Sequence, residues 1–296
     1  MFNRKLKYGI ISLLFTLGLI LANILYFSQK SDELRVVFLD VGQGDAILVS
    51  KGNYQMLIDG GRDGKLLLNK LGKYVPFWDR NIEVILATHP DQDHIAGLIN
   101  VLEKYNVKSI IKTEDKSESQ TYKKFEEEIN NEKAENIDAK KGISIKISDD
   151  AAVEIIYPLS ETGDLADSKS NDGSVVVKIT YGENSFLLTG DLPKEDELAL
   201  ISAIGGPAFG GRSGFALDSR ILKVAHHGSK YATSREFLEK VNPKDAIISV
   251  GKDNSYGHPN EEVTNLLKDK DVNIWRTDEL GDIIYECQKI SECTKK

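Results

Sequence analysis

The histidines of this chain are few, and all of them stand where apolar runs give way to loops. The sequence has five His among 296 residues. His89 and His94 follow the run EVILA, His226 and His227 follow RILKVA, and His258 lies in a loop beyond DAIISV. Loops beyond strand ends are where α/β proteins place binding and catalytic groups. Because imidazole and carboxylate together bind divalent metals, these positions predict metal chemistry.

The densest group of such residues is the segment THPDQDHIAG. It holds His89, Asp91, Asp93 and His94 so close together that a tight turn can direct several of their side chains at one point. The alternative is a polar loop in which Asp93 serves the N-terminus of a following helix. The sequence by itself leaves both interpretations open.

Three further segments supply donors. FLLTGDL places Asp191 after an apolar run and a glycine, where its two oxygens can bridge two cations; a turn aspartate before Pro193 is the alternative. LKVAHHGS places His226 and His227 side by side, and because adjacent side chains diverge, one can bind metal while the other faces substrate. YGHP supplies His258, which alone is more typical of a turn.

Together these donors suffice for two divalent cations, zinc or manganese, with positions left for water. Asp45 in DVGQGDAI and Asp59 in IDGG are predicted to orient the imidazoles through hydrogen bonds, although turn chemistry explains both. The predicted metal ligands are His89, Asp91, Asp93, His94, Asp191, His226 and His258.

One hypothesis for this donor set is the hydrolysis of a phosphoester, the reaction that the family resemblance described below implies. Two cations would share Asp191 and a water molecule, whose lowered pKa makes hydroxide available near neutral pH. Asp93 and His227 are the candidate catalytic residues, and His227 is expected to contact the phosphate or to protonate the leaving oxygen. Ser229 is a candidate donor to phosphate, with ordinary loop polarity as the alternative.

The elements that must position these residues alternate along the chain from Arg35 onward. Interleaved strands and helices predict a layered α/β domain. Strands are predicted over residues 35–39, 46–50, 55–59, 83–87, 109–112, 143–147, 153–157, 174–180, 185–189, 220–225 and 245–250, with the last ones near 272–286. Helices are predicted over residues 65–74, 95–105, 116–136, 233–240 and 261–268, with another one opening at Pro193. The Gly-rich residues 205–214 predict a flexible insertion.

The first thirty residues predict membrane insertion. Residues 8–27 carry no charge and are about as long as a helix that crosses a bilayer. Three basic residues precede this run, so the N-terminus is expected in the cytoplasm and the rest outside. A cleaved signal peptide, which would yield a secreted form, is the alternative. The predicted division is a cytoplasmic stub and membrane anchor over residues 1–30 and a hydrolase domain over residues 31–296.

Composition excludes several classes of protein. The apolar fraction of 41% and the charged fraction of 28% indicate neither a disordered nor a fibrous chain. The net charge of −8 argues against binding nucleic acid through bulk positive charge, but not against holding a phosphate through metal ions. Two cysteines are too few for a Cys-based zinc finger. Cys287 and Cys293 are either free thiols or a small disulfide loop.

The motifs, taken in order, resemble the metallo-β-lactamase superfamily: Asp59, a His-x-x-x-Asp-His turn, Gly-Asp, and then strand-end histidines. The segments FLDVGQGDAILV, THPDQDHIAG, LLTGDL, LKVAHHGS and NSYGHP are similar to signatures of the soluble hydrolase domain of the DNA-uptake channel ComEC. The resemblance covers about residues 35–286. It implies an αββα four-layer sandwich of two mixed sheets flanked by helices, with the metals at one edge and, in this chain, one transmembrane helix in front.

The resemblance also implies roles for the ligands. His89 and the HHG segment would serve one cation, while Asp93, His94 and His258 would serve the other. Two departures stand out. Asp91 occupies a position where the superfamily commonly has histidine, and no histidine lies between residues 94 and 226. Asn171, in the segment NDGS, is expected to face the site in the region of that missing ligand.

The function that the resemblance implies is a membrane-anchored phosphodiesterase or nuclease linked to DNA uptake. A hydrolase of an envelope phosphoester, such as a choline or teichoic-acid linkage, is one alternative. A metal-binding accessory of DNA uptake without catalysis is another. The expected partners are the membrane, through the N-terminal helix, and a phosphoester substrate that includes DNA among its candidates; the sequence points to no protein partner.

Overall fold

The structure is a computed structural model. It describes residues 4–31, 33–159, 173–204 and 217–296. The predicted insertion at residues 205–214 and the predicted site residue Asn171 lie outside the described residues.

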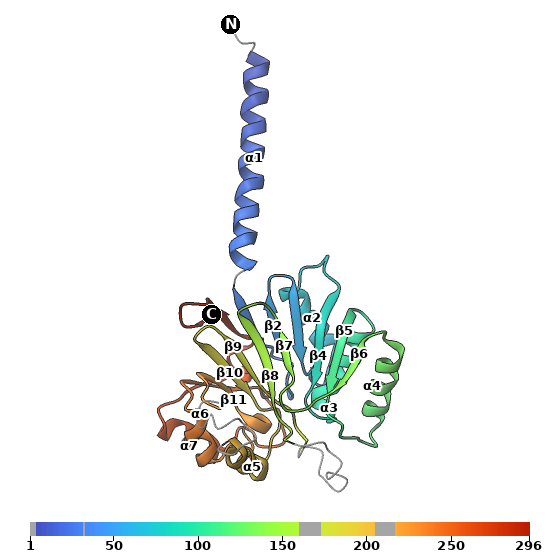
Figure 1. Ribbon diagram of the computed structural model, residues 1–296, viewed down its shortest axis with the longest axis vertical. Coiled ribbons are helices and arrows are strands. Elements are labelled where there is room, and N and C mark those ends of the chain that lie inside the picture. The colour runs from blue at the N-terminus through green and yellow to red at the C-terminus, as the bar shows by residue number, and fades with distance from the viewer. Residues whose placement is uncertain (1–3, 32, 160–172, 205–216) are drawn as a thin grey trace.

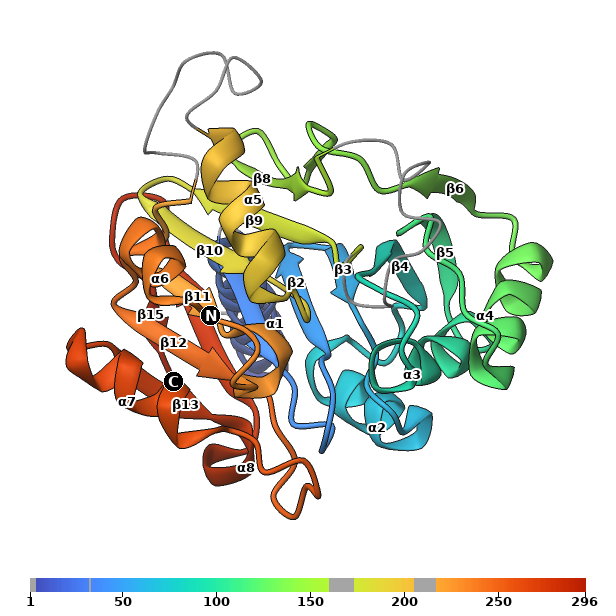
Figure 2. The same cartoon turned by 90° about the horizontal axis from the view of Figure 1, so that it is seen from below.

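Within those ranges the strands form two mixed sheets packed face to face, with helices on both outer faces (Figures 1 and 2). The eight-stranded sheet has the order β15-β14-β1-β2-β3-β4-β5-β6, and the seven-stranded sheet has the order β13-β12-β11-β10-β9-β8-β7. This arrangement confirms the predicted αββα sandwich. The strands are β1 (Leu34–Phe38), β2 (Ile47–Lys51), β3 (Tyr54–Ile58), β4 (Asn81–Ala87), β5 (Asn106–Lys112), β6 (Glu135–Asp138), β7 (Ser144–Lys146), β8 (Ala151–Tyr157), β9 (Val176–Tyr181), β10 (Asn184–Leu188), β11 (Ile221–Lys223), β12 (Asp245–Ile248), β13 (Asn273–Arg276), β14 (Ile283–Cys287) and β15 (Thr294–Lys295).

Helices cover the outer faces of both sheets. Figure 2 shows α2, α3 and α4 beside the eight-stranded sheet and α5, α6 and α7 beside the seven-stranded one. The described helices are α1 (Arg4–Ser31), α2 (Gly64–Tyr74), α3 (Gln92–Leu102), α4 (Gln120–Asn131), α5 (Lys194–Ile204), α6 (Arg235–Val241), α7 (Glu261–Asp269) and α8 (Thr277–Leu280), together with the short 3₁₀ turn η3 (Ala225–Gly228).

Apolar packing between the layers holds the sandwich together. In the central layer the ring of Tyr285 meets Phe38 and Phe186 edge-on, with centroids 6.3 and 5.6 Å away. Leu98 of α3 and Phe237 of α6 are buried in the two outer layers. Because many strands are covered on both faces, their sequences are nearly continuous apolar runs. Each fully buried Leu or Phe stabilises the fold by about 1.5–3 kcal/mol.

The strand directions bring several loops to one edge of the sandwich. β1 and β3 are both antiparallel to β2, and β3 is parallel to β4. The strands β1, β3 and β4 therefore end on the same side of the sheet. In the other sheet β10, β11 and β12 are mutually parallel. Backbone hydrogen bonds join the loops beyond these ends, for example from Asp45 to Asp93 (3.2 Å) and from His226 to Gly190 (3.1 Å). The segments that carry the predicted ligands therefore meet.

The N-terminal helix α1 leaves the start of β1, at the edge opposite to these loops (Figure 1). In the part of the chain that the structure describes, no helix is long and apolar enough to cross a membrane. The predictions of a transmembrane helix in front of the sandwich and of a single-pass membrane localisation are therefore wrong.

Two predicted helices differ from the observed ones. The helix expected from residue 95 already begins at Gln92, because Asp91 takes the extended N-cap conformation. As a result Asp93 and His94 belong to the first helical turn. The long helix expected over residues 116–136 ends at Asn131, and the following Glu135–Asp138 pairs in parallel with β5.

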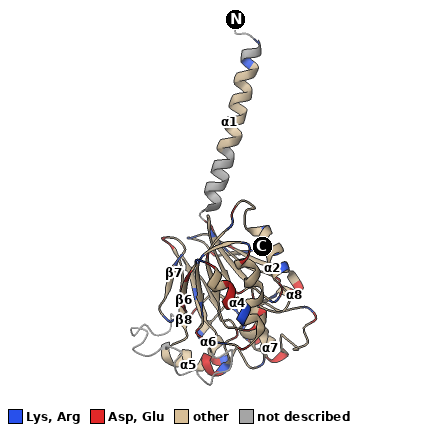
Figure 3. Cartoon of the chain, turned by 90° about the vertical axis from the view of Figure 1, so that its right-hand side faces the viewer, with Lys and Arg blue, Asp and Glu red and all other residues tan. Residues whose placement is uncertain are grey.

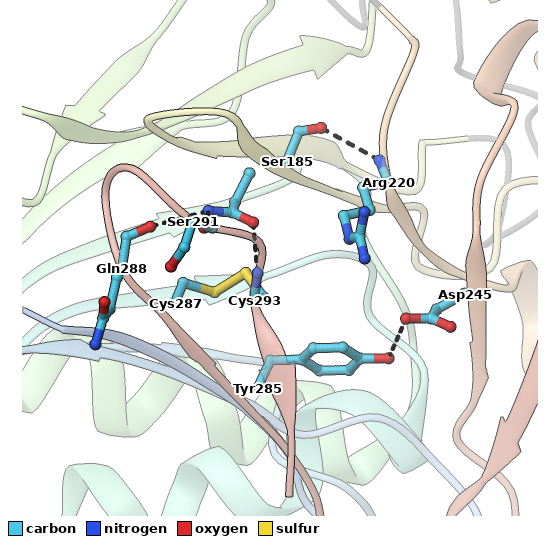
Figure 4. Close-up of a disulfide and its surroundings, with 9 residues drawn as sticks. Ser185, Arg220, Asp245, Tyr285, Cys287, Gln288, Ser291 and Cys293 are labelled. Atoms are coloured by element: carbon cyan, nitrogen blue, oxygen red, sulfur yellow. Dashed lines mark hydrogen bonds between the residues drawn. A yellow bond between two sulfur atoms is a disulfide. The ribbon is translucent and has the colours of Figure 1, made fainter.

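The two cysteines, which the sequence left either free or paired, form a disulfide. Figure 4 shows the loop that this bond closes at the end of β14. Asn184, at the start of β10, donates to the carbonyl oxygen of Ser291 (2.8 Å) and accepts from the backbone N–H of Cys293 (2.7 Å). The disulfide loop is therefore fastened to the other sheet, at the edge away from the predicted ligands.

Candidate metal centre

Asp191 lies at the centre of a buried cluster of histidines and aspartates. Its Oδ1 is 3.4 Å from His94 Nε2, and its Oδ2 is 3.7 Å from His89 Nε2 and 3.8 Å from His227 Nε2. Asp93 Oδ2 lies 3.5 Å from His227 Nε2. These separations are longer than normal hydrogen bonds. They match the spacing of about 3.4 Å between two ligand atoms that each lie about 2.1 Å from one tetrahedral ion.

Each of the three buried imidazoles is held through its Nδ1 atom. His94 Nδ1 is 2.8 Å from Asp59 Oδ2, and His89 Nδ1 is 3.0 Å from the hydroxyl of Thr88. His227 Nδ1 is 2.8 Å from the carbonyl oxygen of Ser249. Such contacts fix the orientation of metal-binding histidines and leave Nε2 for the ion.

The polar atoms at the centre fit divalent cations. Buried polar atoms in proteins nearly always have hydrogen-bond partners. Here, within the described residues, four buried atoms that face the cluster have no such partner, which is the state expected of metal ligands. These atoms are His89 Nε2, His94 Nε2, Asp191 Oδ1 and His227 Nε2.

Four combinations of these residues have ligand atoms within 4.8 Å of one another. Two of them contain Asp45, and in each of these two combinations a carboxylate already has a partner within the protein. In one, Asp59 is hydrogen-bonded to His94. In the other, the ammonium of Lys223 forms an ion pair with Asp45. The combinations that stay available for cations are His89, His94 and Asp191, and Asp93, His94 and His227.

Lys223 is the functional residue that the sequence reasoning missed. Its side chain is fully buried, and its Nζ donates to the carbonyl oxygen of Gly190 at 3.0 Å. A signal was present, because a lysine inside the apolar run RILKVA is rare unless it has a partner.

The backbone beside Asp191 is specified by small residues. The N–H of Asp191 donates to Ser174 Oγ at 2.9 Å, and Gly190 has a φ of +50°. A Cβ on Gly190 would overlap Ser174 Oγ, and a Cβ on Gly44 would overlap the carbonyl oxygen of Asp93. The glycines therefore let neighbouring loops within each sheet approach closely enough to build the centre.

Comparison with known sequences agrees with this geometry. The pattern of the metallo-beta-lactamase superfamily matches residues 39–252, which include most of the cluster. The chain belongs to the metallo-beta-lactamase superfamily. Members of this superfamily are generally metal-dependent hydrolases.

Two curated proteins are similar to most of this chain, and one of them is named as a competence protein. ComE operon protein 3 of Bacillus subtilis is 32% identical over 86% of this chain and 33% of its own length. Competence protein ComA of Neisseria gonorrhoeae is 27% identical over 84% of this chain and 32% of its own length. The chain thus spans about a third of the length of these relatives.

A solved structure shows the same fold. The metallo-beta-lactamase fold protein YhfI from Bacillus subtilis superposes with a TM-score of 0.55, at 13% sequence identity. The match covers 86% of this chain and all of YhfI. At this low identity the likeness supports the superfamily fold alone.

His226 and His258 lie at the rim of the cluster around Asp191. The side chain of His226 is 30% exposed, and its Nε2 lies 3.6 Å from Asp191 Oδ2. The ring of His258 is 5.6 Å from that of His226, and the exposed Tyr256 stacks on its other side at 5.8 Å. His226 thus reaches both the centre and solvent, whereas His227 is buried.

Strained backbone creates this difference between two adjacent residues. His226 and His227 have φ values of +48° and +54°, and Gly228 has +82°. Residues other than glycine rarely adopt positive φ, and such strain concentrates at functional sites. The turn directs His227 into the cluster and His226 along its surface.

Two other predicted residues differ in their relation to the cluster. Asp91 Oδ2 is 3.9 Å from His89 Nε2, and its side chain is 40% exposed. Ser229 is buried in the loop after η3, and its Oγ accepts from the backbone N–H of Tyr231 at 3.3 Å, within its own turn. Of the predicted site residues that it describes, the structure therefore brings together all except Ser229, with Asp91 and His258 at the margin.

The electrostatics of the cluster follow from burial and charge. Burial lowers the pKa of His89 to about 3. Burial also opposes the charged form of His94 and His227, but Asp191 and neighbouring carboxylates outweigh it and raise the pKa of His227 to about 9 and that of His94 well above its ordinary value. Burial alone would raise the pKa of Asp191, yet the imidazoles hold it well below its usual range. The Asp191 carboxylate is therefore ionised and available to cations.

Proposed function

We propose that this chain is a phosphodiesterase that acts on nucleic acid with two divalent cations, zinc or manganese. The observation that carries the proposal is the convergence of three Nε2 atoms on the Asp191 carboxylate while every Nδ1 atom is held from behind. One cation would be held by His89 and His94, the other by Asp93 and His227, with Asp191 between them. When bound, such a pair supplies a nucleophile from water and neutralises charge on the phosphate oxygens.

The residues of the chain contribute position and proton transfer. The hydrogen bonds at Nδ1 keep the imidazoles rigid, so little reorganisation is required when substrate binds. Burial of His89, His94 and Asp191 keeps bulk water away from these ligands. This arrangement supports chemistry at the solvent-facing side of Asp191, where His226 lies.

We assign His226 and His227 the roles opposite to those expected from the sequence. His227 would be a metal ligand, which is supported by its Nδ1 on the Ser249 carbonyl oxygen and its Nε2 toward Asp93. His226 would contact the phosphate or protonate the leaving oxygen, which is supported by its partial exposure at the rim.

The similarity to a relative named as a competence protein supports nucleic acid as the substrate class. An envelope phosphoester, such as a choline or teichoic-acid linkage, is the competing substrate. A metal-binding accessory without catalysis is the competing function. Among the described residues, no feature specifically favours the envelope substrate or the accessory function.

The experiment is a substrate panel on the full chain with added Mn²⁺ or Zn²⁺. It compares bis-(para-nitrophenyl) phosphate, single- and double-stranded DNA, RNA and a choline phosphoester. We expect turnover of the chromogenic diester and of at least one nucleic acid, and loss of both in Asp191→Asn. The matched control is Asp245→Asn, because Asp245 accepts from Tyr285 and Trp275 at the opposite edge.

The outcomes separate the candidates. Cleavage of the choline phosphoester alone would favour the envelope substrate. Metal binding without turnover of any substrate would favour the accessory. If neither metal binds to the full chain, the proposed function is wrong.

A further inference from the structure

A fully buried lysine stands behind the metal centre. Lys223 ends β11, and its ammonium touches three groups: the carbonyl oxygen of Gly190 at 3.0 Å, the carboxylate of Asp45 in an ion pair, and Asp191 Oδ1 at 4.0 Å. Burying an ammonium group costs several kcal/mol unless partners compensate for the lost water. The hydrophobic core gains nothing from this side chain, so its presence calls for an explanation at the site.

The ion pair joins the two sheets at the point where the ligands meet. Asp45 precedes β2 of the eight-stranded sheet, whereas Lys223 belongs to the seven-stranded sheet. Asp45 also lies 3.5 Å from His227 Nδ1 and 3.9 Å from His94 Nδ1. The carboxylate that Lys223 holds is thus packed against the rear of two candidate ligands.

Four carboxylates lie close together at the centre. Asp45, Asp59 and Asp191 are buried within one cluster, and Asp93 borders it. Their mutual repulsion is large in a medium of low dielectric. Lys223 brings to this cluster a positive charge that does not depend on bound metal.

The position of the ammonium also bears on which residues bind cations. Asp45, Asp191 and His227 have ligand atoms within 4.8 Å of one another, so they are themselves a candidate cation position. Lys223 contacts both carboxylates of that group. An ammonium there excludes a metal ion from the same space.

We propose that Lys223 is a built-in counter-ion of the metal centre. It keeps Asp45 and the Gly190–Asp191 turn in place when no cation is bound, and it keeps Asp45 out of the ligand set when cations are bound. Lys223 is in this sense a positioning residue. The inference rests on the proposed function for the presence of the cations, but its effect on the metal-free protein does not require them.

The test is Lys223→Met, which keeps the length of the side chain and removes the charge. In the metal-free protein the Asp45 carboxylate loses its partner, and we expect the Tm to fall by about 5 °C or more. With saturating Mn²⁺ the cations supply the missing charge, and we expect less than half of that fall. Linkage then requires tighter Mn²⁺ binding to the variant, on the order of tenfold, measured by competition with a chelator.

Two further variants make the result specific. Lys223→Met combined with Asp45→Asn removes both charges, and we expect it to recover most of the metal-free Tm. Lys70→Met is the matched control, because Lys70 pairs with Asp282 at 2.6 Å and both side chains are largely buried outside the cluster. It should lower the Tm equally with and without Mn²⁺.

Equal loss of Tm in both states of Lys223→Met, or weaker Mn²⁺ binding, would overturn the inference. If Lys223→Met does not fold, the double variant decides: recovery supports the counter-ion, and a failure to fold contradicts it. If Mn²⁺ leaves the Tm of the unmodified protein unchanged, the proposed function fails. The metal-free comparison of the single and double variants still tests the counter-ion in that case.

Discussion

At the scale of single residues, the centre depends on what stands behind each ligand. His94, His89 and His227 have their Nδ1 atoms engaged by Asp59, Thr88 and the Ser249 carbonyl oxygen, respectively. A histidine that is fixed in this way loses little side-chain entropy on binding an ion. The supporting groups are therefore as much a part of the site as the ligands.

The sequence identified the ligands better than it identified their supports. The sequence shows directly where a histidine or an aspartate follows a strand, as for His89 and Asp191. The contact from Ser249 to His227 is made by a backbone carbonyl oxygen, so the residue type at position 249 does not predict it. The partition of roles between His226 and His227 depends on their positive φ values, which adjacent identical letters do not reveal.

The different roles proposed for His226 and His227 give a prediction for each residue. His227→Ala should weaken Mn²⁺ binding on the order of a hundredfold, because it removes a buried ligand. His226→Ala should leave binding within about threefold of the unmodified value and lower kcat on a diester by about a hundredfold, because it removes a proton donor at the rim. Calorimetric titration with Mn²⁺ and steady-state kinetics measure the two effects. The reverse pattern would restore the assignment expected from the sequence.

At the scale of elements, Glu197 couples α5 to the loop that follows the histidine turn. Its buried carboxylate accepts the backbone N–H groups of Thr233 (2.6 Å) and Ser234 (2.7 Å). Ser234 is the N-cap of α6, and Thr233 has a φ of +59°. One carboxylate therefore fixes the segment that connects η3 to α6.

This arrangement predicts a pH dependence of stability. Burial raises the pKa of Glu197 from 4.5 to about 7, although the two N–H groups oppose the shift. The folded state thus holds the proton more tightly than the unfolded state does. The stabilising contribution is complete below about pH 4.5 and is lost as the pH rises through about 7.

The measurement is urea unfolding of the metal-free protein and of Glu197→Gln from about pH 5 to about pH 8. The free energy of unfolding of the unmodified protein should fall relative to that of the variant by on the order of 3 kcal/mol across this range. Contributions from other groups cancel in the difference. A difference that is constant or that grows with pH would contradict the assignment.

Element positions were largely predictable, and the exceptions have local causes. Buried strands such as β4 and β12 were found because both of their faces are covered, which produces apolar runs. The start of α3 was placed too late because the polar letters of THPDQDH resemble a loop, while Asp91 in fact begins the helix. The strand β6 was merged into a helix, because its charged residues give no strand pattern.

At the scale of the whole molecule, the order of the motifs correctly predicted the αββα sandwich. The prediction of a membrane-spanning segment was wrong. The uncharged N-terminal run does form a helix, α1, but among the described residues no helix is long and apolar enough to cross a membrane. The division of the chain at residue 30 stays a prediction.

Net charge gives a prediction at this scale. The chain carries −8, and on the side shown in Figure 3 basic residues lie among acidic ones in the described part. Long-range repulsion of a polyanion should therefore be relieved by salt. We expect kcat/KM on DNA to rise by a few-fold between about 20 and about 150 mM NaCl, with no comparable change on bis-(para-nitrophenyl) phosphate.

The contrary outcome is equally clear. A protein that binds DNA through several lysine or arginine contacts loses affinity by orders of magnitude over such a change in salt. A steep fall of kcat/KM on DNA alone would indicate a basic binding surface and would contradict the predicted repulsion.

We propose that two cations bind on either side of Asp191. Anomalous diffraction from crystals of the chain soaked with Mn²⁺ or Zn²⁺, recorded at the absorption edge of the metal, would locate them. We expect two peaks about 3.5–4 Å apart, one beside His89 and one beside His227 and Asp93. Absence of peaks at this cluster, or peaks only elsewhere on the chain, would contradict it.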